Sequence, residues 1–134
     1  MNKEDKQLLL KDLSARSIYG VKCLVSFNDG TKDIMTLKSS LPNSFGKWDF
    51  YNEKYSACSD NFKPYLRPMS SMTEEEEIEY DATFATIKMA DGHYDSTMTY
   101  KSFDWLNAHH FDYRGLIEKG LAIEVTEENN PYKD

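Results

Sequence analysis

The residues best suited to chemistry stand together near the C-terminal end, at His109, His110 and Asp112. Imidazole and carboxylate groups are common metal ligands, and a histidine beside a carboxylate can transfer protons near neutral pH. Neighbouring residues on a helix point about 100° apart, so both histidines can face one ion only if the helix ends there. A third ligand would have to come from elsewhere, and the candidates are His93, Asp91 and Asp95.

The same three residues also have a structural interpretation. Histidines at the C-terminal end of a helix interact favourably with its dipole, and an aspartate can cap the turn that follows. The sequence contains no G-x-S-x-G elbow around Ser70 or Ser71 and no glycine-rich phosphate loop. We therefore keep His109, His110 and Asp112 as weak catalytic candidates and predict neither a bound metal nor a cofactor.

A second candidate site combines aromatic and basic side chains. Aromatic rings beside lysines and arginines can stack nucleic-acid bases or contact a protein. The binding residues predicted in this way are Trp48, Tyr51, Tyr65, Arg67 and Arg114. The alternative is that the rings form the core of a small sheet.

Charge is distributed unevenly along the chain, whose net charge is −7. Residues 1–72 contain 11 basic and 8 acidic residues, whereas residues 73–134 contain 5 and 15. An acidic chain disfavours non-specific nucleic-acid binding, although the first half leaves a weak option for it. The run Glu74–Glu77 is either a docking surface for a basic partner or a solvated helical turn.

The first half of the sequence predicts a helix and several strands. Leu9, Leu10 and Leu13 indicate an amphipathic helix from residue 3 to about residue 17. Alternating residues predict strands at 21–27 and 31–38, joined by a turn at Asn28-Asp29-Gly30. Short strands are expected at 48–51 and 55–58. Two prolines predict an edge strand or a strand end at 62–68.

The second half predicts mainly helices. Thr73 and Glu76 form a capping-box pattern that starts a helix, which we expect to run to residue 90 before Asp91-Gly92. Its apolar stripe consists of Ile78, Ala82, Ala85 and Met89. A polar loop at 94–100, a helix from 101 to 109 or 110, a turn capped by Asp112 and a short strand at 121–125 should follow.

These elements predict one α+β domain spanning residues 1–134. An N-terminal helix precedes a small antiparallel sheet, open or barrel-like, and the C-terminal helices pack on that sheet. Residues 1–72 form the helix-and-sheet half, residues 73–125 the acidic helical half, and residues 126–134 a frayed tail. Cys23 and Cys58 are predicted to be buried free thiols. Neither a signal peptide nor a membrane-spanning segment is indicated, so we expect a cytoplasmic protein.

Three blocks of the sequence resemble a family of small uncharacterised proteins from gut anaerobic bacteria and their phages and mobile elements. The blocks are LLLKDLSAR at 8–16 with YGVK at 19–22, KPYLRPMSSMTEEE at 63–76, and NAHHFDYRGLIEKGLA at 107–122. The resemblance implies an accessory or phage-related role and assigns no catalytic residue.

The leading functional hypothesis is a non-enzymatic binding module that recognises a protein partner. One alternative is a metal-dependent or acid–base enzyme centred on His109, His110 and Asp112. Another is an acidic inhibitor or DNA mimic that uses the acidic half against a basic protein.

Overall fold

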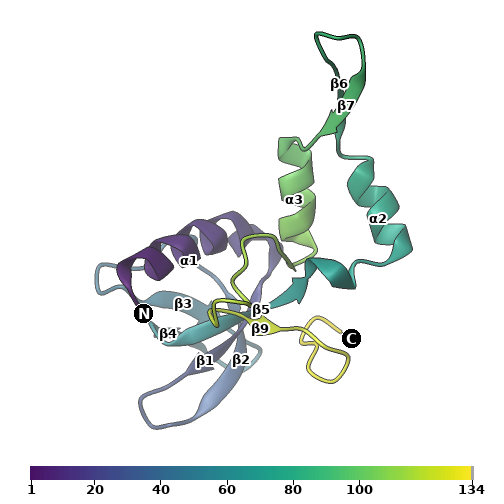
Figure 1. The fold of residues 1–134 in the computed structure, drawn as a ribbon. Coiled ribbons are helices and arrows are strands. Elements are labelled where there is room, and N and C mark those ends of the chain that lie inside the picture. Colours follow the sequence, from purple (N-terminus) through teal and green to yellow (C-terminus); the bar gives the residue numbers. More distant parts are fainter. Residues whose placement is uncertain (134) are drawn as a thin grey trace.

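The computed structural model describes residues 1–133 as a sheet with one long helix on it and a projecting arm (Figure 1). The strand order of the main sheet is β4-β3-β2-β1-β5-β8, and β9 also pairs with β5. The strands are β1 (Lys22–Ser26), β2 (Lys32–Leu37), β3 (Trp48–Tyr51), β4 (Ser56–Ser59), β5 (Phe62–Pro68), β8 (Phe111–Asp112) and β9 (Ile123–Glu124). The first four form an antiparallel meander, whereas β8 and β9 run parallel to β5.

The β1–β2 hairpin forms where the sequence predicts it. Asp29 accepts hydrogen bonds from the backbone N–H and the hydroxyl of Thr31, and Gly30 adopts φ 87°. Glycine has no Cβ to clash in this left-handed conformation. Val21, Cys23 and Val25 face the core, as the alternation of the strand requires.

Strand β5 changes its partner along its length. Residues 62–64 pair with β1, residues 65–66 with β9 and residues 67–68 with β8. Pro64 is the last β5 residue that pairs with β1. Proline has no N–H to donate, so it fits at this end of the pairing without interrupting a row of hydrogen bonds. The expected edge strand is therefore a connecting strand in the middle of the sheet.

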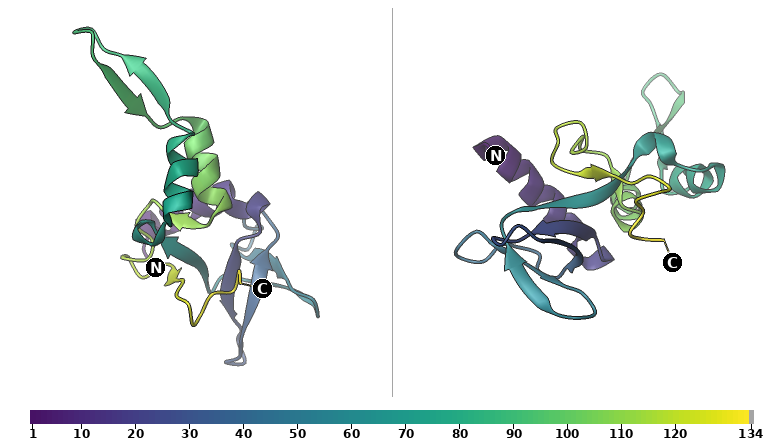
Figure 2. Two further views of the ribbon diagram at one scale, coloured as in Figure 1. Left: turned by 90° about the vertical axis from the view of Figure 1, so that its right-hand side faces the viewer. Right: turned by 90° about the horizontal axis from the view of Figure 1, so that it is seen from below.

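Helix α1 (Lys3–Arg16) covers one face of the sheet, as two views show (Figures 1 and 2). Asn2 caps its first turn by accepting a hydrogen bond from the N–H of Asp5 at 2.8 Å. Leu9 and Leu13 pack into a core built from the inner face of the meander, β5 and the segment after β8. A short 3-10 turn, η1 (Ser17–Tyr19), leads from α1 to β1.

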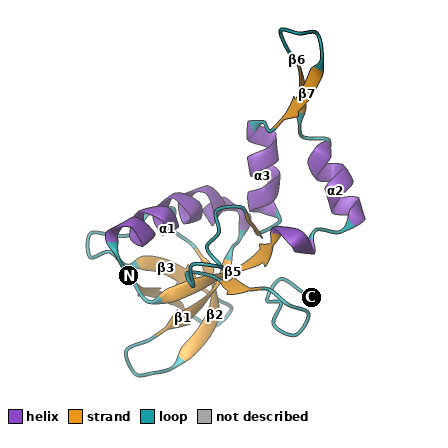
Figure 3. Cartoon of the chain, viewed as in Figure 1, coloured by secondary structure: helices purple, strands orange, loops and turns teal. Residues whose placement is uncertain are grey.

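The second half leaves the sheet and returns to it (Figure 3). After the 3-10 turn η2 (Met69–Ser71) come α2 (Glu74–Asp81), β6 (Ala85–Lys88), β7 (Tyr94–Thr97) and α3 (Tyr100–Ala108). The capping box of Thr73 and Glu76 forms as predicted. The predicted helix over 73–90 is wrong beyond residue 81, and the predicted loop at 94–100 contains a strand.

A hairpin turn explains both errors. Gly92 adopts φ 94°, and the N–H of Met89 donates to the carbonyl of His93 at 2.7 Å. Asp91-Gly92 therefore closes a β-hairpin instead of ending a helix. The β-branched residues Thr83, Thr86 and Ile87 disfavour helix in the same stretch.

Residues 126–133 are attached to the sheet through Tyr132, which differs from the frayed tail expected over 126–134; residue 134 lies outside the described residues. The hydroxyl of Tyr132 accepts a hydrogen bond from the N–H of Lys22 and donates one to the carbonyl of Tyr65, at 3.0 and 2.7 Å. Tyr132 thereby bridges β1 and β5 where their direct pairing stops. Burial raises the pKa of the Tyr132 phenol, so the hydroxyl keeps the proton that it donates.

The structure confirms the α+β class, with an N-terminal helix, a sheet and helices after it. Two further expectations are corrected. The sheet is mixed and open instead of purely antiparallel or barrel-like, because β8 and β9 return alongside β5. Cys23 is buried, but Cys58 is exposed because it points to the opposite side of β4 from the buried Ser59. No helix within residues 1–133 has both the length and the hydrophobicity to cross a membrane.

Candidate functional site

His109 packs at the end of α3. Its Nδ1 lies 2.9 Å from the carbonyl oxygen of Trp105, and its ring stacks on the Trp105 indole with 4.1 Å between centroids. The same carbonyl also accepts the backbone N–H of His109 at 3.1 Å, so backbone and side chain of His109 both bind the last turn of the helix. The side chain therefore has the capping role that its position predicts.

His110 reverses the chain direction between α3 and β8. It is the one non-glycine residue with positive φ, 64°, in the described chain. Its ring stacks on Tyr132 with 3.8 Å between centroids, and its Nδ1 is buried without a protein partner. Burial, reinforced by the positive charge of Arg16, lowers the pKa of His110 to about 4.

Asp112 caps the turn that follows β8. Its two carboxylate oxygens accept hydrogen bonds from the N–H groups of Leu116 and Ile117, each at 2.9 Å. The side chains of His109, His110 and Asp112 thus have separate partners and do not converge. His93 contacts Asp91 and Asp95 at the tip of the β6–β7 hairpin. Residues 1–133 contain no group of three histidine, cysteine or acidic side chains placed to hold a metal ion.

The predicted aromatic and basic binding residues do not form one surface. Trp48 and Tyr65 are buried, and Tyr51 is exposed on the opposite face of β3 from Trp48, because alternate residues of a strand point to opposite sides. Arg67 forms a two-pronged ion pair with Glu76 at 2.7 and 2.6 Å. Arg114 lies over the Tyr113 ring near α1.

A buried charge cluster joins α1 to the C-terminal segment. Asp12 and Arg16 are fully buried and paired at 2.7 Å, and a second Arg16 nitrogen donates to the carbonyl of Phe111. Arg114 approaches the other Asp12 oxygen at 3.9 Å. Sequence reasoning missed this cluster, although Leu9, Asp12, Leu13 and Arg16 follow the spacing of one helix face. The Asp12–Arg16 pair is closed to solvent, so we interpret the cluster as a structural connection.

The most exposed part of the molecule is the segment 74–97, which comprises α2, β6 and β7 and is called the arm below. Neither α2 nor the hairpin contains a buried residue. The arm has eight acidic residues and one lysine, whereas the rest of the chain has fifteen basic and fifteen acidic residues. The entire net charge of −7 therefore resides in the arm.

Apolar side chains accompany this charge. Four large apolar residues of the arm are exposed, at 71% for Ile78, 65% for Tyr94, 47% for Ile87 and 41% for Met89. Single exposed apolar residues are common, but four in one short projecting segment are not needed for folding. An acidic surface that also carries apolar side chains is suited to a basic protein surface.

The arm is held firmly at its base. Tyr80 stacks on Trp105 with 5.5 Å between centroids, and Thr83 donates from its hydroxyl to that of Ser102 at 2.7 Å. The ion pair with Arg67 lowers the pKa of Glu76 to about 2. These contacts fix the arm on β5 and α3 without covering its outer surface.

The comparisons with known proteins give no relative from which a role could be transferred. No protein-family model matches the chain, no curated protein matches it, and no solved structure matches it. The exposed and acidic arm is therefore the feature of the molecule that best supports a functional proposal.

Proposed function

We propose that this protein is a non-enzymatic interaction module of the cytoplasm that binds a basic partner protein through the arm. The observation that supports this most directly is the confinement of the whole net charge to an exposed segment that also presents Ile78, Ile87, Met89 and Tyr94. The accessory or phage-related origin of the module rests on the three sequence blocks and their family resemblance.

The geometry favours binding over catalysis. The charged and apolar side chains of the arm lie on its outside, whereas the histidines of the C-terminal cluster are occupied by stacking and capping contacts. Acidic side chains steer a basic partner during approach, and the apolar side chains lose contact with water once it has docked.

Site-specific photo-crosslinking in cells tests this proposal. A photoreactive phenylalanine analogue at Tyr94 is compared with the same analogue at Ile18, which is 79% exposed and lies outside the arm. We expect an adduct with a basic protein at position 94 and none at 18. Equal adducts at both positions, or none at 94, would contradict the proposal.

A charge-matched pair of variants then tests the recognition. The arm variant Glu74→Gln, Glu75→Gln, Glu77→Gln is compared with Glu118→Gln, Glu127→Gln, Glu128→Gln, which removes the same charge from exposed positions elsewhere. Glu76 is left in place because it pairs with Arg67. The arm variant should bind the captured partner about tenfold more weakly at low salt, and the control should bind normally. Equal affinities of the two variants would contradict the role of the arm.

The acidic-inhibitor alternative uses the same surface and predicts one additional result. A partner that is itself a DNA-binding protein would lose the captured module when DNA is added, because both ligands would occupy its basic surface. If the partner retains the module in the presence of DNA, the acidic-inhibitor alternative is wrong and the module docks on a surface that does not bind DNA.

A further inference from the structure

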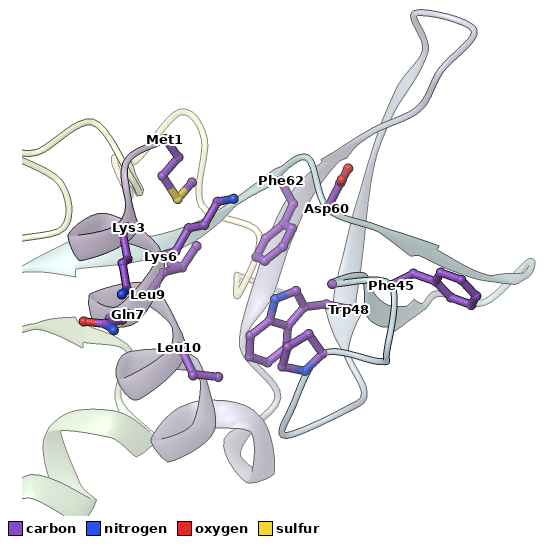
Figure 4. A pocket seen from close by; sticks show the side chains of 12 residues that line it. Met1, Lys3, Lys6, Gln7, Leu9, Leu10, Phe45, Trp48, Asp60 and Phe62 are labelled. Carbon is purple, nitrogen blue, oxygen red and sulfur yellow. The ribbon is translucent and has the colours of Figure 1, made fainter.

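A pocket of about 560 Å³ opens between the first half of α1 and the loop before β3 (Figure 4). Its volume is within the range of small-molecule sites. Trp48 and Phe62 form its base, with their ring centroids 6.2 Å apart in an edge-on arrangement. Leu9 and Leu10 provide the wall on the helix side, and Pro42 contributes from the loop. The pocket contains no residue of the arm.

The polar groups at this pocket are mainly donors. Figure 4 shows the Lys6 side chain extending along the mouth toward Phe62, whereas the amine of Lys3 points away from Trp48. Among the contacts of residues 1–133, no ion pair involves Lys6 and no side-chain hydrogen bond involves the indole N–H of Trp48. Asp60 lies at the rim beyond Phe62 and is the only acidic residue that lines the pocket.

We infer that this pocket binds a small apolar carboxylate. An aromatic or aliphatic body would cover Phe62, Leu9, Leu10 and the Trp48 ring, and its carboxylate would face the Lys6 ammonium at the mouth and the Trp48 N–H on the same side of the base. Burying the body removes apolar surface from water, and the free donors select for an anionic head group. This site is independent of the proposed function, because the arm variants leave it intact.

Titration with a matched pair of ligands tests the inference. The probes are 1-naphthylacetate and its neutral analogue 1-naphthylacetamide, followed in ¹H–¹⁵N spectra of the full chain. The chain has two tryptophans, so the indole resonance of Trp48 reports on the pocket and that of Trp105 serves as an internal control. A ligand of this size is expected to have a Kd of about 0.1 to 1 mM.

The expected result is a saturable shift of the Trp48 resonance, with the acid binding about three- to fivefold more tightly than the amide. Lys6→Gln should abolish that preference, whereas Lys11→Gln, an exposed change on the same helix outside the pocket, should preserve it. Equal binding of acid and amide to the unmodified protein would overturn the carboxylate assignment. Absence of a Trp48 shift up to about 5 mM ligand would overturn the site itself. Loss of the preference in Lys11→Gln as well would show a general charge effect and would also overturn the role of Lys6.

Discussion

At the scale of single residues, His110 determines how the C-terminal segment is placed. Its left-handed backbone directs the chain from α3 into β8, and its neutral ring stacks on Tyr132. A histidine at this position is unfavourable for folding in two ways. Its Cβ disfavours the positive φ, and the burial of its ring disfavours protonation.

Stability should therefore fall in acid because of His110. Its pKa is about 4 in the folded chain and 6.5 in the reference state, so between these values only the unfolded chain gains the proton. The free energy of unfolding should decrease by on the order of 3 kcal/mol as pH falls from 6.5 to 4. Urea unfolding across this range, for the protein and for His110→Asn, measures the effect, because asparagine tolerates positive φ and does not titrate.

The pH range separates this contribution from that of Glu76. The pKa of Glu76 is lowered as well, but the stability that Glu76 contributes is lost only between about pH 4.5 and 2. A parallel decline of His110→Asn and the unmodified protein between pH 6.5 and 4 would contradict the prediction.

At the scale of elements, sequence patterns identified those parts of the fold that local chemistry determines. The 21–38 hairpin, the Thr73 capping box and the cap by Asp112 depend on residues close together in the chain. The stripe of Ile78, Ala82, Ala85 and Met89 was misleading, because helical periodicity indicates burial only if another element covers that face. No neighbouring element covers the outer face of the arm, and the Asp91-Gly92 turn permits a hairpin there.

The same limitation applies to the candidate site. The types and spacing of His109, His110 and Asp112 are evident in the sequence, but their separate partners, Trp105, Tyr132 and the 116–117 backbone, depend on tertiary packing. The burial of Asp12 and Arg16 could have been predicted from their helical spacing with Leu9 and Leu13. The pocket beside α1 could not have been predicted, because it joins segments more than thirty positions apart.

The two hairpins should differ strongly in local stability. An isolated two-stranded hairpin is marginally stable in water, and all residues of β6 and β7 are exposed. Strands β1 and β2 instead contribute to the core. In native-state hydrogen exchange, amides of β6 and β7 should exchange at least about a hundredfold faster than those of β1. Equal protection of both hairpins in the isolated protein would contradict this picture and indicate that the arm is already covered.

At the scale of the whole molecule, a few contacts connect the two ends of the chain. Arg16 of α1 donates to the carbonyl of Phe111, and Tyr132 joins Lys22 to Tyr65. The second half of the sequence is therefore not a separate helical unit, because β8, β9 and Tyr132 complete a sheet that begins near residue 22.

Removal of the Tyr132 hydroxyl should destabilise the entire domain. Tyr132→Phe keeps the ring stacked on His110 but leaves the Lys22 N–H and the Tyr65 carbonyl without their partner, a cost of about 1 to 3 kcal/mol. Chemical denaturation measures this cost as a lower unfolding midpoint at an unchanged slope. Tyr100→Phe, which removes a hydroxyl at a position that is 73% exposed, should leave the midpoint unchanged. Equal midpoints for both variants would show that the bridge contributes nothing.

The Tyr132 bridge also sets an order of events during synthesis. Residue 132 follows Lys22 by 110 positions, so a ribosome must add all of the intervening residues before Tyr132 can bridge β1 and β5. The β1–β2 hairpin and the start of α1 can form while translation continues, but the sheet lacks the Tyr132 bridge between β1 and β5 until residue 132 has been added. Loop closure over such a separation slows folding, so the contacts of Tyr132 are expected to form after the local β1–β2 hairpin.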